Sequence, residues 1–213
     1  MILQKMVRKT KAEAERTRQQ IIDAARRVFY KCGVTKSTLE GIAAAAGVTR
    51  GAVYWHFRNK TELFFAMRAQ AVLPLFDRIE DEMLVERPED PLDGIEHALR
   101  QMIDNLKSDK VAGEVFRIAS LRCEYVDELA PILDEFKKSH ARRLAKLTTA
   151  YRRARDKGTL REGLEPRAMA LDTMSFYEGM LRRFALEAGS GLITRNLRKM
   201  IHDHIALRRK QPA

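Results

Sequence analysis

The sequence predicts an all-α protein with an N-terminal helix-turn-helix unit and a larger C-terminal helical domain. Three observations predict this. Helix start signals crowd into residues 37–63, apolar residues recur at helical spacing along most of the chain, and no segment alternates like a β-strand. With 213 residues, 45% of them hydrophobic and 32% charged, the chain has the composition of a globular protein of one or two domains.

Residues 37–63, STLEGIAAAAGVTRGAVYWHFRNKTEL, carry the local signals of a helix-turn-helix followed by a third helix start. Two capping boxes, an N-cap threonine and a turn glycine are present: Ser37 with Glu40, Asn59 with Glu62, Thr49, and Gly47. They predict helices at 38–46 and 50–57 joined by a left-handed turn. The alternative is an ordinary helical hairpin inside a core. It explains poorly why the second helix carries arginine, tyrosine, tryptophan and histidine.

The remaining helices follow from apolar spacing and from breaks at glycine and proline. They are expected at residues 11–31, 60–84, 92–106, 111–122, 128–157, 167–187 and 194–207. Pro74 falls inside the second of these, where its ring would clash with the carbonyl of Gln70, which predicts a kink or a break. We expect two domains, residues 1–60 with a flexible start over 1–10, and residues 61–213.

The positive charge of the chain is concentrated in its first domain. The formal net charge is +11, and residues 1–60 hold 13 Lys or Arg against 4 Asp or Glu, whereas residues 61–213 hold 27 against 25. A solvated charged surface without a partner explains this asymmetry poorly. A basic face on a helix-turn-helix is the electrostatic footprint of phosphate binding, so the sequence predicts double-stranded DNA as a partner.

Several classes of function are disfavoured by what the sequence lacks. It has no apolar run near 18 residues and no apolar leader segment, which predicts a cytoplasmic protein without a membrane partner. Cys32 and Cys123 are far apart, and His202 and His204 point to different faces of a helix, so no metal or cofactor is expected. The absence of nucleophile motifs, phosphate-binding glycine loops and dinucleotide fingerprints argues against an enzyme.

The residues of the second short helix suit a DNA major groove. Arg50 at its start has the two donors that pair with a guanine edge, and Gly51 lets the backbone approach a base closely. Tyr54 and His56 suit phosphate oxygens, and Trp55 suits packing on a sugar or donation from its indole N–H. For Tyr54, a partly buried place in the core is the alternative.

Residues 33–64, GVTKSTLEGIAAAAGVTRGAVYWHFRNKTELF, resemble the DNA-binding signature of TetR-family repressors. With MVRKTK at 6–11 and RCEYVDEL at 122–129, the closer likeness is to the AcrR and TtgR type, which controls multidrug efflux pumps. The resemblance implies DNA contacts by six residues: Arg50, Gly51, Tyr54, Trp55, His56 and Lys60. Four hydroxyl residues are weaker candidates for phosphate contacts: Thr17, Ser37, Thr38 and Thr49. Capping is the alternative role for Ser37 and Thr49.

The penultimate helix carries apolar residues on more than one side, which favours a homodimer. The resemblance implies that the last two helices pair as a four-helix bundle, with these residues at the interface: Met169, Thr173, Tyr177, Met180, Leu181 and Phe184. Packing of one side on the core is the alternative, and both can hold at once.

Methionine and aromatic residues of the middle helices suit a lipophilic ligand. Seven ligand-binding candidates follow from this lining, its polar neighbours and the resemblance: Met102, Phe116, Ser120, Cys123, Met174, Glu178 and Arg182. Glu178 and Arg182 are four residues apart, the spacing of a helical ion pair. Plain core packing is the alternative. Where TtgR-like proteins have polar and imidazole groups this chain has Phe116, Ser120 and Leu121, so their ligand set does not carry over directly.

Together these features predict a homodimeric repressor of a drug-efflux operon that a lipophilic inducer releases from its operator. Within the same family, a regulator of lipid, quorum-signal or catabolic genes is the alternative. Outside it, the alternative is an architectural protein that binds DNA with little sequence preference.

Overall fold

The structure is a computed structural model that describes residues 11–82, 90–187 and 191–211. Predictions on the chain start, on residues 83–89 and on residues 188–190 lie outside these described ranges. The helices are α1 (Lys11–Cys32), α2 (Leu39–Ala46), α3 (Arg50–His56), α4 (Lys60–Ala71), α5 (Leu73–Glu82), α6 (Pro91–Ser108), α7 (Lys110–Leu121), α8 (Ala130–Asp156), α9 (Pro166–Leu186) and α10 (Leu192–Ala206), with a 3-10 turn η1 (Asp127–Leu129) before α8. No strand occurs in these ranges, which confirms the all-α prediction.

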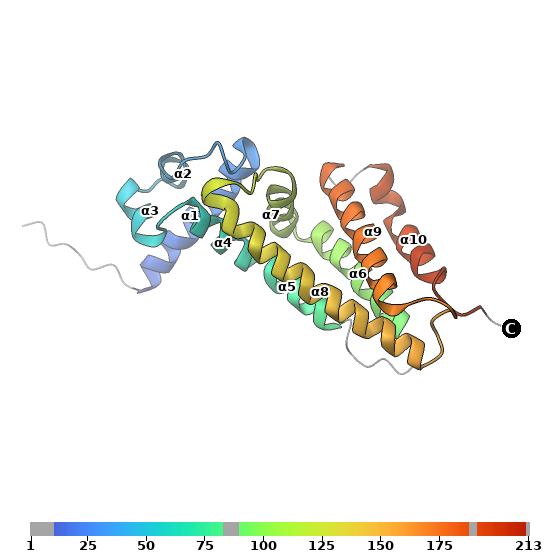
Figure 1. Ribbon diagram of the computed structural model, residues 1–213. Helices are drawn as coiled ribbons and strands as arrows, with labels where there is room; N and C mark the ends of the chain where they lie inside the picture. Colours follow the sequence, from blue (N-terminus) through green and yellow to red (C-terminus); the bar gives the residue numbers. More distant parts are fainter. Residues whose placement is uncertain (1–10, 83–89, 188–190, 212–213) are drawn as a thin grey trace, which may run out of the picture.

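The molecule is elongated, and its two ends have different helices (Figure 1). The helices α1 to α3 form one end, and α9 and α10 lie side by side at the other. The long helix α8 runs along the molecule between them. The predicted recognition helix is therefore far from the predicted pairing helices.

The described residues form two apolar cores, one in each part of the molecule. The first combines α1 to α4 with residues of α7 and of the start of α8, including Val115, Ile118 and Ile132. The second is built by α5, α6, α8, α9 and α10 with part of α7. Because α4 contributes Leu63 and Phe64 to the first core, that core extends past the predicted boundary at residue 60.

The helix predicted over 60–84 is two helices. α4 ends at Ala71, and the chain turns at Val72, whose φ of −122° and ψ of −41° are not helical. Pro74 lies in the first turn of α5, where the backbone N–H has no helical partner and its loss costs little. The proline therefore marks the start of a second helix after a full break.

The cap of α2 also differs from the prediction. Thr38 is the N-cap and its hydroxyl accepts from the N–H of Gly41, whereas Ser37 is buried and its hydroxyl donates to the carbonyl of Gly33 at 2.5 Å. The other signals hold. Gly47 ends α2 with a φ of 67°, and Thr49 and Asn59 cap α3 and α4.

Besides the contact of Lys60 with Glu128 described below, four polar contacts among the described residues join the first core's helices to the second domain. The hydroxyl of Thr61 donates to the carbonyl of Glu128 at 2.6 Å, and the N–H of Val34 donates to the carbonyl of Arg122 at 2.8 Å. The other two are an ion pair between Arg26 and Glu114 and a hydrogen bond from Arg117 to Tyr30. These contacts connect α1 and α4 to α7 and η1.

Adding a methyl group at Gly113 should destabilise the contact between α6 and α7. A β-carbon there would lie 2.7 Å from the carbonyl oxygen of Leu106, so the two helices would have to separate. We expect Gly113→Ala to lower the free energy of unfolding by about 1–3 kcal/mol. Gly51→Ala is the control, because its β-carbon would come no closer than 4.0 Å to its nearest neighbour, the Thr49 hydroxyl. Urea denaturation decides, and equal stability of both variants would contradict the close approach.

Candidate nucleic-acid interface and ligand cavity

The recognition helix α3 packs one face in the first core and exposes the opposite face. Val53 and Phe57 are buried in the first core, while Tyr54 and Trp55 are 43% and 73% exposed. Arg50 and Gly51 are exposed at the helix start. This rules out a core position for Tyr54. The predicted base and phosphate contacts of α3 stay predictions, and the side chains of Arg50, Tyr54 and Trp55 are exposed.

Glu40 on α2 organises the two best candidates on α3. Its carboxylate lies 3.0 Å from the Arg50 guanidinium and accepts a hydrogen bond from the Tyr54 hydroxyl at 3.4 Å. The Arg50 guanidinium also lies 5.3 Å from the centre of the Tyr54 ring. The sequence assigned Glu40 to a capping box, so this role was missed. An acidic residue on the helix before the recognition helix was the available signal.

Two of the weaker DNA candidates have buried side chains, so their predicted phosphate contacts gain no support from this structure. The side chains of Thr17 and Ser37 are buried, and each donates to a backbone carbonyl one turn earlier in the chain. Thr38 and Thr49 are exposed, but both hydroxyls accept a capping hydrogen bond from a helix N–H. Only the last two remain open to a phosphate.

Lys60 is a tether rather than a free positive charge. Its ammonium group donates to the carbonyls of Thr35 and Ser37 and lies 2.8 Å from the Glu128 carboxylate, and the side chain is 11% exposed. In this structure the charge is engaged by groups of the chain itself, and the contact of Lys60 with a DNA phosphate stays a prediction. Lys60 connects the helix-turn-helix to η1 of the second domain.

An apolar cavity of about 700 Å³ lies among α4, α5, α7, α8 and α9. Its aromatic and aliphatic walls come from all five helices: Phe65, Val72, Leu73, Phe76, Val115, Phe116, Leu133, Phe136 and Leu181. A volume of this size is typical of small-molecule sites. Because α4 forms one wall, the cavity touches a helix that also supports α3.

Four of the seven predicted ligand residues line this cavity, namely Phe116, Ser120, Glu178 and Arg182. The other three, Met102, Cys123 and Met174, do not. Met102 is buried in the second core, Met174 packs against that core, and Cys123 packs against the first core, where burial raises the pKa of its thiol to about 11. Their surroundings agree with the alternative of plain core packing.

The polar groups of the cavity pair differently from the prediction. Glu178 lies 3.3 Å from His140 and 4.0 Å from Arg143, and Arg182 donates to the carbonyl of Ser120. The expected pair of Glu178 with Arg182 is therefore wrong. Arg143 also lies 3.1 Å from Glu80, whose side chain is 3% exposed.

Sequence reasoning missed the walls supplied by α4, α5 and α8, among them Arg68, Phe76 and Phe136. Their helices are distant in the chain from the middle helices that carried the methionine signal. Leu181, predicted for a dimer interface, is another wall residue.

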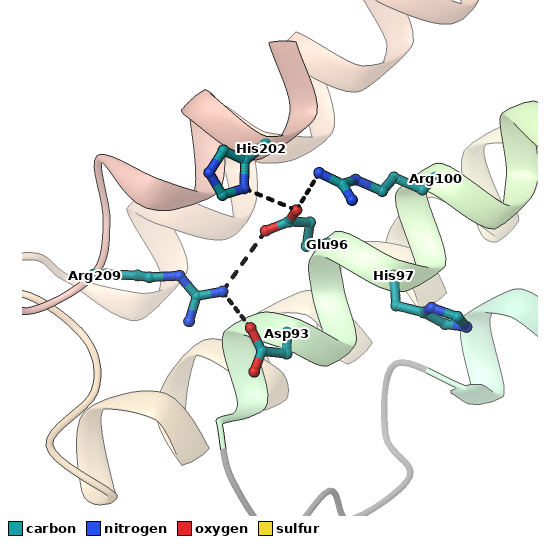
Figure 2. Close-up of a pocket in the computed structure, with 6 residues that line it drawn as sticks. All are labelled: Asp93, Glu96, His97, Arg100, His202 and Arg209. Carbon is teal, nitrogen blue, oxygen red and sulfur yellow. Dashed lines mark hydrogen bonds and ion pairs between the residues drawn. The ribbon is translucent and has the colours of Figure 1, made fainter. Parts of the chain in front are cut away.

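A second hollow lies between α6 and α10, and its charges satisfy one another (Figure 2). The Glu96 carboxylate lies 2.5 Å from Arg100 and 3.1 Å from His202, and Arg209 reaches both Glu96 and Asp93. This network ties the end of α10 to α6. We therefore place the candidate ligand site in the cavity beside α4.

Five of the six residues predicted at the dimer interface are buried inside the single chain: Thr173, Tyr177, Met180, Leu181 and Phe184. The Tyr177 hydroxyl, for example, donates to the carbonyl of Leu99 at 2.9 Å. Met169 is half-buried against the same core. The five covered side chains are not accessible to a partner in this structure, so burial gives their place at an interface no support, and the interface stays a prediction.

His204 on α10 is held as a neutral ring. It stacks on Phe176 with ring centres 3.8 Å apart, and its Nε2 lies 3.1 Å from the Thr173 hydroxyl. Burial and then the charge of Arg208 lower the pKa of its imidazole to about 4, while Asp172 opposes this shift. Within the described residues, no cluster of His, Cys, Asp or Glu is arranged to hold a metal ion. Every described helix is too short or too polar to cross a bilayer.

Replacing Lys60 tests whether it acts as a tether or as a phosphate contact. Lys60→Met should lower the free energy of unfolding by about 1–3 kcal/mol, because it removes hydrogen bonds from a charged donor. The salt slope of DNA binding, which is the change in the logarithm of the binding constant with the logarithm of salt concentration, should be unchanged. Lys36→Met is the control for stability: Lys36 is exposed just before α2, so loss of its charge should leave the free energy of unfolding unchanged. The opposite pattern for Lys60→Met would place Lys60 on the DNA.

Lowering the pH should reduce the free energy of unfolding more in the wild-type protein than in the His204→Gln variant. An unfolded imidazole has a pKa near 6.5, so between about pH 6.5 and 4 the unfolded state binds a proton that the folded state does not. The free energy of unfolding therefore falls as pH falls through this window. The full shift corresponds to about 3 kcal/mol, and screening of the half-exposed ring reduces the expected difference to about 1–2 kcal/mol.

Urea unfolding at pH 7 and pH 4.5 measures this difference between the two proteins. His97→Gln serves as the control, because His97 is exposed on α6. If His204→Gln loses as much stability as the wild type, the imidazole is not held neutral by the fold.

Comparisons with known proteins agree with this arrangement. Residues 21–67 match the model of the bacterial regulatory proteins, tetR family. The chain is 34% identical over 212 residues to the HTH-type transcriptional regulator TtgR of Pseudomonas putida, covering 98% of this chain and 99% of that protein.

Two solved structures are similar over nearly the whole chain. NalD, the secondary repressor of the MexAB-OprM multidrug efflux pump in Pseudomonas aeruginosa, matches with a TM-score of 0.81 and 25% identity, covering 95% of this chain and 100% of that one. A SmeT–triclosan complex matches with a TM-score of 0.77 and 30% identity, covering 92% of this chain and 93% of that one. SmeT is described as the repressor of the Stenotrophomonas maltophilia efflux pump SmeDEF. From its recognition helix, its fold and these relatives, the chain belongs to the TetR family of bacterial regulatory proteins.

Proposed function

We propose that this protein is a cytoplasmic, ligand-responsive transcriptional repressor that binds operator DNA and releases it when a lipophilic molecule fills the cavity. The single observation that carries the proposal is the position of α4. The helix begins at Lys60, four residues after α3 ends, and its later residues form a wall of the cavity. Filling the cavity therefore acts on the helix that supports the recognition helix.

The mechanism is a shift between two arrangements of the chain. In the unliganded state α4 holds α3 at the orientation that suits the operator, and a ligand that prefers another position of α4 lowers the operator affinity. The contacts of Lys60 and Thr61 with Glu128 carry the change between the domains.

The regulated genes in this proposal are those of a multidrug efflux pump. NalD and SmeT are described as repressors of such pumps, and SmeT has been solved with triclosan bound. The large aromatic cavity of this chain supports the same kind of control.

The proposed DNA-binding unit is a homodimer that pairs through the outer face of α9 and α10. Large apolar side chains are exposed at these helices in the described part of the chain: Leu171, Leu186, Leu192 and Leu207. On α9, Leu171 shares a face with Ser175 and Gly179, which are exposed and small enough for close approach of a second helix. A dimer places two recognition helices on a two-fold operator.

The operator is tested with a labelled fragment of the DNA just upstream of the gene. Arg50→Ala should cost about 1–3 kcal/mol of binding free energy at particular base pairs, because it removes a base contact. Arg152→Ala, an exposed change on the far part of α8, should leave binding unchanged. Binding of any sequence with equal affinity, or equal loss by both variants, would argue for an architectural DNA-binding protein instead.

The dimer is tested by sedimentation at micromolar concentration. Leu171→Glu should shift the protein towards the monomer without lowering its helical content, because the side chain is exposed in the single chain. Val126→Glu is the control, since Val126 is also exposed but lies on the loop before η1. A dimer unaffected by Leu171→Glu would place the pairing surface elsewhere. Phe184 is unsuitable for this test because it is buried in the core.

A further inference from the structure

Arg68 is a buried cation that lines the cavity without a carboxylate partner among the described residues. It lies on α4, and the residue is 6% exposed. In the described part of the chain, every ion pair near the cavity is made by other side chains. A buried charge is costly unless a counter-ion or hydrogen-bond acceptor meets it, so this guanidinium calls for an anion.

Two aromatic rings offset only part of that cost. The guanidinium carbon lies 4.2 Å from the centre of the Phe136 ring and 5.9 Å from that of Phe64. Such cation–π contacts stabilise the flat face of the guanidinium group. They leave the N–H donors at its edge without an anionic acceptor, and a planar guanidinium can offer a pair of these to one carboxylate or sulfonate.

The acidic groups of the cavity are already paired or lie at its surface. Glu178 lies beside His140 and Arg143, and Glu135 lies 2.9 Å from Lys138. Asp77 is exposed. None of these carboxylates is in ion-pair contact with Arg68, so the cavity offers an unpaired positive site at its α4 wall.

The rest of the lining near this wall is apolar. Phe65, Phe76 and Phe116 come from α4, α5 and α7, and Leu133 and Leu181 come from α8 and α9. The hydroxyl of Tyr125 is occupied, because it donates to the carbonyl of Ala119. A ligand therefore meets apolar side chains beside Arg68. Of the other cations in the lining, Arg143 pairs with Glu80 and Arg182 is bonded to the Ser120 carbonyl.

We propose that the cavity binds a lipophilic anion whose carboxylate or sulfonate group pairs with Arg68 and whose apolar body lies among the phenylalanine side chains. This inference deepens the proposed function by naming the ligand class of the same cavity. It depends on the proposed function only for its consequence at the DNA.

The same geometry gives the anion a route to the recognition helix. Thr61 and Arg68 are seven residues apart, so they lie on one face of α4, two turns from each other. An anion that draws Arg68 towards the cavity acts on the helix whose first turn is bonded to Glu128. Release of operator by the anion follows from this connection.

The test compares two fluorescent probes with nearly the same body. One is 1-anilinonaphthalene-8-sulfonate, and the other is its uncharged parent, N-phenyl-1-naphthylamine. The full-length wild-type protein should bind the sulfonate at least tenfold more tightly, at one molecule per chain, and the two probes should displace each other. Equal affinities, or preference for the uncharged probe, would overturn the proposal without any variant being made.

Two variants then locate the effect. Arg68→Met should weaken the sulfonate tenfold or more and leave the uncharged probe within twofold, which also shows that the cavity is intact. Arg183→Met is the control, because Arg183 is an exposed arginine on α9 that does not line the cavity. It should change both affinities by less than threefold. Sulfonate binding that survives Arg68→Met, or that Arg183→Met weakens equally, would overturn the assignment.

If Arg68→Met does not fold, Arg68→Lys tests the same pairing of the sulfonate with residue 68. It retains the charge but loses the paired donors, so it should bind the sulfonate more weakly than the wild type and the uncharged probe equally well. All these measurements are made without DNA. Selective sulfonate binding that leaves operator affinity unchanged would refute the proposed coupling while leaving the ligand class standing.

Discussion

The rest of the structure depends on α4, because this helix packs in the first core and also contacts η1 and the cavity of the second domain. The helical repeat places Leu63, Phe64 and Met67 on one face, where they complete the first core. It places Thr61 and Arg68 on the adjoining face, towards η1 and the cavity, with Phe64 between the two faces and its ring beside the Arg68 guanidinium. Three short helices bury too little apolar surface to be stable alone, so the helix-turn-helix needs this fourth helix. The turn at Val72 makes α4 a short helix that is separate from α5.

Weak contacts with Glu40 orient the side chains of the recognition helix in the free protein. Glu40 keeps Arg50 and Tyr54 in place in the free protein, but all three side chains are exposed. An exposed ion pair of this kind is worth about 0–1 kcal/mol, so a guanine edge can replace Glu40 as the partner of Arg50. The carboxylate also disfavours approach to a phosphate by the same arginine through charge repulsion. Glu40 therefore favours reading of a base over nonspecific contact.

Local signals predicted the elements well because each acts within one turn of chain. The left-handed Gly47 and the caps at Thr49 and Asn59 were correct for this reason. Ser37 and Thr38 are adjacent hydroxyl residues with equal capping chemistry, and only the packing of Ser37 in the fold decides between them. Features that depend on which helices meet could not be predicted in the same way. The spacing of apolar residues shows that Tyr177 lies on a buried face, but not that its own chain covers it. Arg68 resembles an ordinary surface arginine in the sequence until α8 brings Phe136 over it.

The central claim is that an occupied cavity moves the recognition helix through α4. Double electron–electron resonance measures this directly, with spin labels at Arg58→Cys beyond α3 and at Arg152→Cys on α8, in a chain with Cys32→Ser. Cys123→Ser removes the second native thiol, which is free and only partly buried and would otherwise also take up label. Labelled protein diluted with unlabelled protein gives the distance within one chain. Saturating 1-anilinonaphthalene-8-sulfonate should shift that distance by about 2 Å or more. An unchanged distance with the cavity filled would contradict the account.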